Sequence, residues 1–594
     1  MFRERVSKTP NLEAFSYPVG DRWESMNWTQ VAEQVDLLAA GMLALGIADD
    51  DRVGLVCSTR LEWLLGDIAI NVAGAATSTI YPSSTADDCA YILSDSAAKL
   101  CIAENDAQVR KLQEIRSQVG NLAHVIVIDG QGSDDGWVLS WDELKQRGKA
   151  WSGENPTGLD DVLGRLDPSR LSTLIYTSGT TGRPKGVELT HDCWMYTGEA
   201  IDTVKLLNSD DKQYLWLPLS HSFGKMLETL VIAIGIPTAV DGRIDKIIDN
   251  LAVVRPTFMA AAPRIFEKVY NKVVNGAQQA GGLKFAIFKW ALGVGRAASK
   301  ELQAGRQPSG LLGLQFSIAD KLVFSKLRER FGGRVRFFIS GSAPLNREIA
   351  EFFHAAGLLI LEGYGLTESS AASFVNRPES NKFGTVGPPL PGTEVKIAED
   401  GEILFRGRGI MRGYHNLADV TAETLLEGGW LATGDIGEVD PDGHLRITDR
   451  KKDLIKTSGG KYVAPQALEG SFKAVCPYVS QILVHGNNRN FCSALITMEP
   501  EAIAAWAADN GLGDKSYEQL AQEPKVIALF QGYVDQLNAP LARFETIKKF
   551  ALLPADFAIE TGELTPSLKV KRKAVEAKYK DLLDDFYAGA MAGV

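Results

Sequence analysis

The stretch DRVGLVCSTRLEWLLGDIAINVAGAATSTIYP, residues 51–82, predicts a strand, a helix and a second strand in succession. Short apolar runs at its two ends flank a longer run with helical spacing. The same alternation continues through DDCAYILSDS, KLCIAE, DAQVRKLQEIRSQV and HVIVID. Because parallel strands need crossover helices of this kind, we predict a layered α/β sheet with helices on its faces.

The pattern changes after about residue 394. TEVKIAEDGEILFRG and GEVDPDGHLRITD contain short alternating strands with Asp-Gly turns. A final block contains a predicted hairpin, QILVHGNNRNFCSALITME, and ends in a charged helix. We therefore predict a large N-terminal α/β domain, residues 1–451, and a small mobile α+β C-terminal domain, residues 452–594. The stretches QGSDDGW and WSGENPTGLDD are predicted to be loops that separate subdomains.

Composition excludes several classes of protein. The formal net charge of -11 argues against a general nucleic-acid binder, so a polyanionic ligand must meet local basic clusters. The six cysteines show no CxxC spacing, which indicates neither a zinc ribbon nor a disulfide framework and favours a reducing cytoplasm. The N-terminus has no apolar signal region, and apolar runs such as MLETLVIAIGI are too short to span a bilayer. A soluble cytoplasmic protein is expected.

The run YTSGTTGRPKG, Tyr176 to Gly186, follows the apolar strand LSTLIY and carries the sharpest chemical signal. Glycines let backbone N–H groups approach phosphate oxygens, hydroxyls donate further hydrogen bonds, and Lys185 adds a positive charge. The spacing is not that of a Walker motif, because Val187 follows Gly186. Composition alone leaves a flexible surface loop as an equal alternative.

The order of residues in this run is similar to the signature phosphate loop of the adenylate-forming superfamily, which includes acyl-CoA synthetases, luciferases and peptide-synthetase adenylation domains. Further motifs that resemble this family follow in the expected order, from LPLSHSFG at Leu217 through SGSAPL at Ser340, GYGLTES at Gly363 and TGD at Thr433 to DRKKDLIKTSGG at Asp449. The resemblance covers the chain from about residue 25 to the C-terminus. It implies ATP and CoA as co-substrates and Mg²⁺ as cofactor.

The resemblance also implies roles for individual residues. Glu368 helps to hold magnesium, and Thr177 is either a second ligand or a donor to phosphate. His221 lies where the acyl and nucleotide sites meet, unless it is a satisfied buried histidine. Tyr364 stacks on adenine, Asp435 accepts from the ribose hydroxyls, Arg450 contacts phosphate or ribose, and Lys452 is the interdomain hinge. The implied nucleotide-binding set is Thr177, Ser178, Gly179, Thr180, Thr181, Gly182, Lys185, Gly341, Ser342, Gly363, Tyr364, Gly365, Thr367, Asp435 and Arg450.

Near the C-terminus, GELTPSLKVKRKAV places Lys569 before a basic helix. Positive charge at a helix N-terminus is mildly unfavourable, so this lysine has another reason to be there. It resembles the catalytic lysine of the family. TPSLK, where many members read SGK, resembles the long-chain synthetases, as does the extended segment from Arg264 to Arg336. The resemblance therefore implies a long-chain fatty acid:CoA ligase.

Several questions stay open at this level. An enzyme that delivers acyl-AMP to a carrier protein, a non-catalytic nucleotide- or lipid-binding homologue, and luciferase-like oxidation are alternatives. The segment LKFAIFKWALGVGRAASK, residues 283–300, is either a surface helix that packs its apolar face on the large domain, the favoured interpretation, or an interfacial helix in contact with a membrane. The motifs do not specify the oligomeric state.

Overall fold

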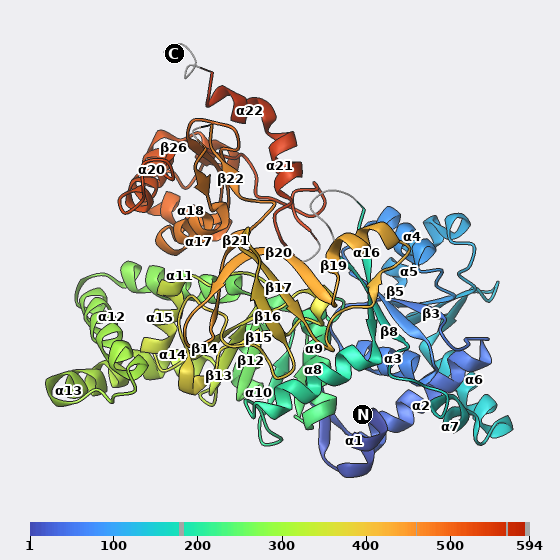
Figure 1. Cartoon of the computed structure of the whole chain (residues 1–594). Helices are drawn as coiled ribbons and strands as arrows, with labels where there is room; N and C mark the ends of the chain where they lie inside the picture. The colour runs from blue at the N-terminus through green and yellow to red at the C-terminus, as the bar shows by residue number, and fades with distance from the viewer. Residues whose placement is uncertain (178–182, 459, 566–567, 589–594) are drawn as a thin grey trace.

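The computed structural model describes residues 1–177, 183–458, 460–565 and 568–588. Two eight-stranded sheets with helices on their faces form the body, a five-stranded sheet lies against them, and a smaller C-terminal unit sits on top in the view of Figure 1. The predicted class, a large α/β domain followed by a small α+β domain, is confirmed. Among the described residues, no helix combines the length and the apolar character needed to cross a bilayer.

The first sheet has the strand order β18-β9-β8-β4-β3-β5-β6-β7. The prediction for residues 51–82 is confirmed, because β3 (Arg52–Val56) and β4 (Ala76–Ile80) pair in parallel and α3 (Leu61–Val72) connects them. The other elements of this layer are β5 (Leu100–Asn105), β6 (His124–Asp129), β7 (Val138–Ser140), β8 (Leu171–Thr177), β9 (Lys185–Thr190), β18 (Gly413–Tyr414), α2 (Trp28–Ala44), α4 (Ala86–Asp95), α5 (Asp106–Glu114), α6 (Trp141–Glu154) and α7 (Gly158–Leu163).

One predicted loop is wrong. Residues 151–154 are the last turn of α6 and residues 158–161 are the first four of α7, so only residues 155–157 form a connection. The preceding part of α6 is packed closely on α2, since a Cβ on Gly148 would lie 1.9 Å from the carbonyl oxygen of Leu37. A helix that has already formed is extended at little cost, so it continues into this stretch in spite of the local composition. The stretch QGSDDGW is a loop, but it joins β6 to β7, which are neighbours in one sheet. Neither stretch therefore separates subdomains.

The second sheet has the order β15-β14-β13-β12-β10-β11-β1-β2 and shares one continuous apolar core with part of the first. Helix α9, buried along nearly its whole length, contributes to this core. The elements of this layer are β1 (Glu13–Val19), β2 (Arg22–Asn27), β10 (Gln213–Leu215), β11 (Thr238–Val240), β12 (Phe258–Ala261), β13 (Phe337–Ser340), β14 (Leu359–Tyr364), β15 (Phe374–Val375), α1 (Phe2–Lys8), α8 (His191–Thr203), α9 (Ser222–Ile234), α10 (Ile247–Val254) and α15 (Arg347–Ala355).

The extended segment between Arg264 and Arg336 is helical. It connects the parallel neighbours β12 and β13 and projects from the left side of the molecule in Figure 1. Its elements are α11 (Pro263–Ala280), α12 (Gly282–Gln303), α13 (Gly310–Ala319), the π-helical turn η3 (Asp320–Phe324) and α14 (Ser325–Arg330). Within α12, Phe288 is buried and Phe285 and Leu292 pack against the core, which agrees with the favoured interpretation of residues 283–300 for these three. Leu283 and Trp290 of the same predicted apolar face are exposed.

The five-stranded sheet contains the predicted Asp-Gly turns. Gly401 and Gly443 have φ values of +83° and +82°, a left-handed conformation that glycine adopts without steric cost. These turns join β16 (Glu394–Ile397) to β17 (Glu402–Arg406) and β20 (Trp430–Val439) to β21 (Leu445–Arg450); β19 (Leu425–Leu426) and α16 (Ala418–Thr424) complete this part.

The C-terminal unit has apolar clusters of its own, which begin at Ile455. The predicted hairpin is confirmed as the antiparallel pair β24 (Val479–His485) and β25 (Cys492–Met498), extended by β26 (Ile547–Leu552). The charged C-terminal end forms two helices, α21 (Arg572–Lys578) and α22 (Lys580–Asp585). The remaining elements are β22 (Ile455–Lys456), β23 (Tyr462–Val463), α17 (Pro465–Val475), α18 (Pro500–Asp509), α19 (Tyr517–Ala521) and α20 (Pro524–Asn538).

Candidate active site

The ends of the phosphate loop are held by a β-hairpin. β8 ends at Thr177 and β9 begins at Lys185, and these two residues lie opposite each other in the antiparallel ladder. Thr177 Oγ1 lies 3.5 Å from the carbonyl oxygen of Lys185. The predicted phosphate-binding residues Ser178, Gly179, Thr180, Thr181 and Gly182 lie outside the described residues.

A tyrosine that sequence reasoning missed links this hairpin to Glu368. Tyr414 of β18 pairs with β9, and its hydroxyl donates a 2.7 Å hydrogen bond to Glu368 Oε1. The ammonium of Lys185 lies 4.9 Å from the centre of the Tyr414 ring. Burial, and then the Glu368 charge, raise the pKa of Tyr414, so its hydroxyl keeps its proton and acts as a donor. A Gly-Tyr pair is too common to have identified this residue from sequence.

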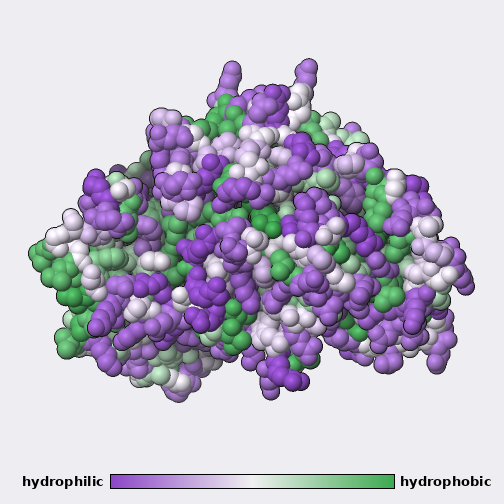
Figure 2. Space-filling model, turned by 90° about the horizontal axis from the view of Figure 1, so that it is seen from below, coloured by the Kyte–Doolittle hydropathy of each residue, from purple (hydrophilic) through white to green (hydrophobic). Residues whose placement is uncertain are grey.

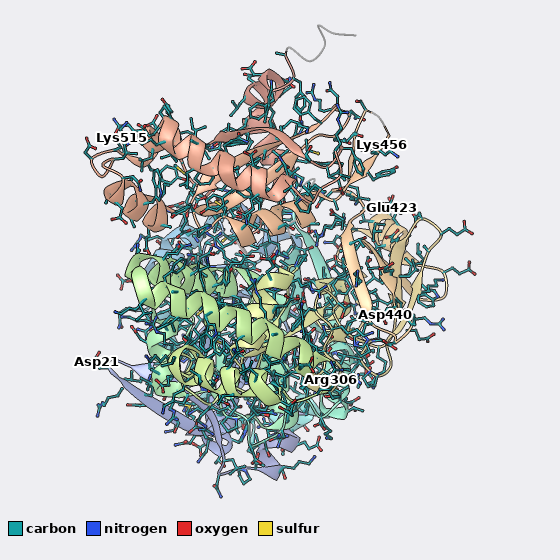
Figure 3. All side chains as sticks on the ribbon, turned by 90° about the vertical axis from the view of Figure 1, so that its left-hand side faces the viewer. Asp21, Arg306, Glu423, Asp440, Lys456 and Lys515 are labelled. Atoms are coloured by element: carbon teal, nitrogen blue, oxygen red, sulfur yellow. The ribbon has the colours of Figure 1, made fainter. Side chains whose placement is uncertain are left out.

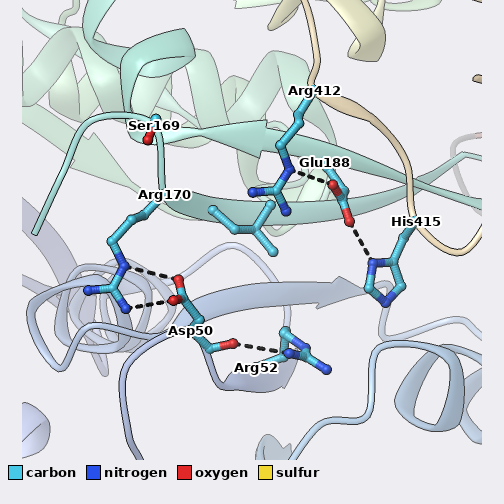
Figure 4. Close-up of a pocket in the computed structure, with 8 residues that line it drawn as sticks. Asp50, Arg52, Ser169, Arg170, Glu188, Arg412 and His415 are labelled. Atoms are coloured by element: carbon cyan, nitrogen blue, oxygen red, sulfur yellow. Dashed lines mark hydrogen bonds and ion pairs between the residues drawn. The ribbon is translucent and has the colours of Figure 1, made fainter.

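The pocket in Figure 4 explains how β18 is held in place. Arg412 and His415, on either side of the Gly413–Tyr414 strand, contact the two oxygens of Glu188 in β9 at 2.7 Å and 2.6 Å. The pocket has a volume of about 270 Å³, and its charged side chains pair mostly with one another. None of the predicted site residues line it, so we assign it a structural role.

Tyr364, Asp435 and Arg450 form a second cluster. The Tyr364 hydroxyl donates to Asp435 Oδ2 at 2.5 Å, and Arg450 Nε lies 3.4 Å from Asp435 Oδ1. Burial raises the pKa of Asp435, and the charge of Arg450 opposes that shift. Gly363 is the residue before Tyr364 in β14, and Gly365 follows it. A Cβ on Gly365 would lie 2.1 Å from the carbonyl oxygen of Ala371, so this turn requires glycine.

His221 is the N-cap of α9. Its Nδ1 accepts a 3.1 Å hydrogen bond from the backbone N–H of Phe223. Burial, and then the charge of Lys569, lower the pKa of His221 to about 3. The imidazole is therefore neutral and carries its proton on Nε2.

The end of β13 and the turn before Glu368 border the same helix terminus. Thr367 Oγ1 lies 3.1 Å from the hydroxyl of Ser222, the first residue of α9. A Cβ on Gly341 would lie 3.2 Å from the Phe223 ring. Ser342 follows with a φ of +70°, which turns the chain immediately after β13. These predicted residues thus lie beside the N-terminus of α9.

Lys569 comes to this site from the C-terminal unit. Its backbone N–H donates to Thr565 Oγ1 at 3.0 Å, which orders the chain before α21. The Lys569 side chain is exposed. Its pKa is nevertheless lowered to about 8, first by desolvation and then by the charge of Arg450, while the charges of Asp435 and Glu368 oppose this shift. The charges of all three groups therefore act on the ammonium. The structure brings together predicted residues that are spread over 393 positions, from Thr177 to Lys569.

This fold and site define a class of protein. Residues 2–415 match the model of the AMP-binding enzymes, and residues 452–591 match the model of the C-terminal domain of AMP-binding enzymes. The chain therefore belongs to the family of AMP-binding enzymes.

Full-length relatives narrow the comparison. The chain is 37% identical over 590 residues to the long-chain-fatty-acid–CoA ligase FadD15 of Mycobacterium bovis. This alignment covers 99% of this chain and 96% of the relative. It is 32% identical over 630 residues to the long-chain-fatty-acid–CoA ligase ACSBG2 of Xenopus laevis, in an alignment that covers 99% of this chain and 83% of the relative.

Solved structures share the fold. The adenylation domain of a carboxylate reductase from Mycobacterium chelonae superposes with a TM-score of 0.74 at 21% identity, covering 99% of this chain and 90% of that one. A fatty acyl CoA synthetase of Mycobacterium tuberculosis gives a TM-score of 0.62 at 21% identity, covering 98% of each chain.

Proposed function

We propose that this chain is a long-chain fatty acid–CoA ligase. In the first half-reaction the acid's carboxylate attacks the α-phosphate of ATP, which forms acyl-AMP and releases pyrophosphate. In the second, the thiol of CoA attacks the acyl carbonyl, which forms acyl-CoA and releases AMP. The observation that carries the proposal is the cluster of Tyr364, Asp435 and Arg450, which lies within range of the Lys569 charge. The names of the full-length relatives support the choice of substrate.

Each residue has a role in the first half-reaction under this proposal. The backbone and hydroxyls of Thr177–Gly182 and the charge of Lys185 bind phosphates. Asp435 keeps enough acceptor capacity for ribose hydroxyls beside its bond to Tyr364, because a carboxylate has about four lone-pair sites. Tyr364, half-buried, offers its ring to adenine. The neutral His221 can donate from Nε2 at the junction of the acyl and nucleotide sites.

We further propose that Glu368 and Thr177 would hold the magnesium ion that accompanies ATP. Within the described ranges, no group of three or more His, Cys, Asp and Glu side chains could hold a metal unaided. One carboxylate and one hydroxyl nevertheless fit magnesium in a nucleotide enzyme, because substrate phosphates and water complete its shell of oxygen ligands. When bound, the ion would stabilise the charge that develops on the leaving pyrophosphate.

Tyr414 is a positioning residue in this scheme. We expect Tyr414→Phe to lower the adenylation rate roughly ten- to a hundredfold, because a hydrogen bond to a charged group contributes about 1.5–3 kcal/mol. The magnesium concentration for half-maximal pyrophosphate release should rise, since the Glu368 carboxylate is then less well oriented. A purely structural role would leave this magnesium dependence unchanged.

Tyr196→Phe is the matched control for Tyr414→Phe. The Tyr196 hydroxyl is also part-buried, and it bonds to the carbonyl of Pro391 at 3.0 Å and to the hydroxyl of Thr393 at 2.8 Å instead of to Glu368. The control should lose comparable stability without changing the magnesium dependence. Equal magnesium dependence in both variants and the unmodified protein would contradict the assignment.

Chain-length preference tests the substrate. We expect acids of about twelve or more carbons to be used in preference to acetate, because each buried methylene contributes about 0.8 kcal/mol. The protein is incubated with ATP, magnesium and a ladder of fatty acids, with and without CoA, and the products are identified by mass. Acetate that turned over as efficiently as palmitate would refute the long-chain assignment. Acyl-AMP as the only product in the presence of CoA would instead favour delivery to a carrier protein.

The two half-reactions need a hinge between the domains, which we assign to Lys452. Lys452 lies in the turn between β21 and β22, where we place the hinge about which the C-terminal domain turns between the half-reactions. One arrangement would bring Lys569 to ATP and exclude water, and another would admit the CoA thiol.

Because long-chain acids partition into bilayers, we also propose that the enzyme acts in peripheral contact with lipid.

A further inference from the structure

Helix α13 is apolar on both of its faces, although it lies at the surface. Leu312 and Phe316 point inward and pack against the core of the large domain. A helix that is apolar all round is normally buried on all sides, and α13 is not. The outward face and the following turn η3 form a row that we name the α13 stripe: Leu311, Leu314, Ile318 and Leu322, with 71%, 61%, 45% and 46% of their surface exposed.

The α13 stripe lies at one end of the molecule. Figure 2 shows hydrophobic residues gathered at the left edge, the end at which Figure 1 places α13. In Figure 3, α12 and α13 face the viewer, with Arg306 from the connection between them labelled. Successive members of the stripe are separated by three or four positions, so they follow one side of the helix. An exposed apolar row of this kind marks an interaction surface.

The segment that carries the stripe is rich in basic side chains. Residues 282–330 contain nine Lys and Arg side chains against three Asp and Glu, in a chain whose net charge is -11. Two of the acids are neutralised locally, because Glu301 pairs with Arg306 at 2.7 Å and Asp320 pairs with Arg328 at 2.7 Å. The other seven cations form no ion pair with the described part of the chain: Lys284, Lys289, Arg296, Lys300, Lys321, Lys326 and Arg330.

We propose that the α13 stripe and the basic side chains of the same segment dock the protein onto an anionic lipid bilayer. The stripe enters the boundary between headgroups and acyl chains, and the basic side chains, led by Lys321 and Lys326, contact the headgroups. Trp290 of α12, 37% exposed, has the amphipathic ring that favours this boundary.

A lipid surface fits better than a second copy of the chain. Two copies that met through this face would bring two sets of unpaired cations together, and like charges repel. An anionic bilayer supplies the opposite charge and an apolar layer at once. The inference rests on the proposed function in one respect: docking would serve to capture a substrate dissolved in the membrane. Binding of the protein to a bilayer needs neither ATP nor a fatty acid.

Vesicle binding by the full chain tests the proposal. Vesicles of phosphatidylcholine, with and without one third phosphatidylserine, are sedimented with the unmodified protein and with the triple variant Leu311→Ser, Leu314→Ser, Ile318→Ser. We expect the anionic vesicles to bind the unmodified protein, and the triple variant to lose roughly tenfold or more of its partition coefficient. Lys321→Glu with Lys326→Glu should weaken binding to anionic vesicles and reduce its dependence on salt.

The matched control is Ile244→Ser, Ile248→Ser, Val253→Ser. These apolar residues at and before α10 are 61%, 47% and 65% exposed, comparable to the stripe. The control should bind vesicles like the unmodified protein. Both triple variants should keep their rate with a medium-chain acid supplied from solution, which reports that they are folded.

The proposal is overturned if the unmodified protein does not bind anionic vesicles or if both triple variants bind equally. It is also overturned if light scattering finds a dimer that the stripe variant alone dissociates, because the occupant is then a second copy. Loss of the ligase reaction without loss of vesicle binding would refute only the proposed function.

Discussion

Lys569→Ala is expected to lose the first half-reaction and keep the second. Removing a charged donor that stabilises the attacking carboxylate and the α-phosphate costs roughly 3 kcal/mol, which lowers the adenylation rate about a hundredfold or more. The second half-reaction should need the C-terminal domain turned away from this site. Purified acyl-AMP supplied with CoA should therefore give acyl-CoA at a rate near that of the unmodified protein.

Lys573→Ala is the control, because Lys573 is an exposed lysine in the first turn of α21, shortly after Lys569. It should leave both half-reactions unchanged. If both half-reactions fall together in a folded Lys569→Ala protein, either the two-arrangement mechanism is wrong for this chain or Lys569 is not its catalytic lysine.

The pKa of Lys569 adds a pH dependence to this prediction. Because desolvation and Arg450 lower that pKa from 10.5 to about 8, the ammonium is charged at neutral pH and loses its proton as the pH rises through about 8. The kcat/KM of adenylation, which reports the free enzyme, should therefore fall above this pH. Lys569→Arg keeps its charge throughout and should move this fall to higher pH at a lower maximal rate. A profile identical in the two proteins would show that another group titrates.

Glu368→Gln is expected to depress pyrophosphate release about a hundredfold or more, because a neutral amide is a poor ligand for a hard cation and the charge near the leaving group is lost. The amide oxygen can still accept from Tyr414, so the local shape should persist. The rate is measured over a magnesium titration, in which high magnesium should recover part of the activity.

The exposed Glu379 offers a control, since Glu379→Gln makes the same change of charge in a surface turn further along the chain. That variant should release pyrophosphate at the normal rate. Near-normal release by Glu368→Gln at limiting magnesium would refute the assignment of Glu368.

The sequence by itself determined the elements whose signals are local. Alternating runs predicted β3, α3 and β4, because side-chain periodicity reflects which face of an element is buried. Asp-Gly pairs located two turns, since glycine adopts positive φ without steric cost. The ordered motifs, read through their resemblance to a family, indicated a nucleotide site and nominated Lys185, Tyr364 and Asp435.

Only the tertiary structure decided which of these residues meet. Tyr414 reaches Glu368 across 46 positions, and the charge of Lys569 in the C-terminal unit acts on Asp435, because strand pairing and domain packing create neighbours that no local pattern encodes. The last turn of α6 forms in spite of its Gly-Ser composition, because it extends a helix that the close approach of Gly148 to Leu37 already packs on α2. For the same reason the apolar residues of α13 could be sorted into inward and outward sets only after their neighbours were known: burial is a property of the packed chain, and hydrophobicity alone does not determine it.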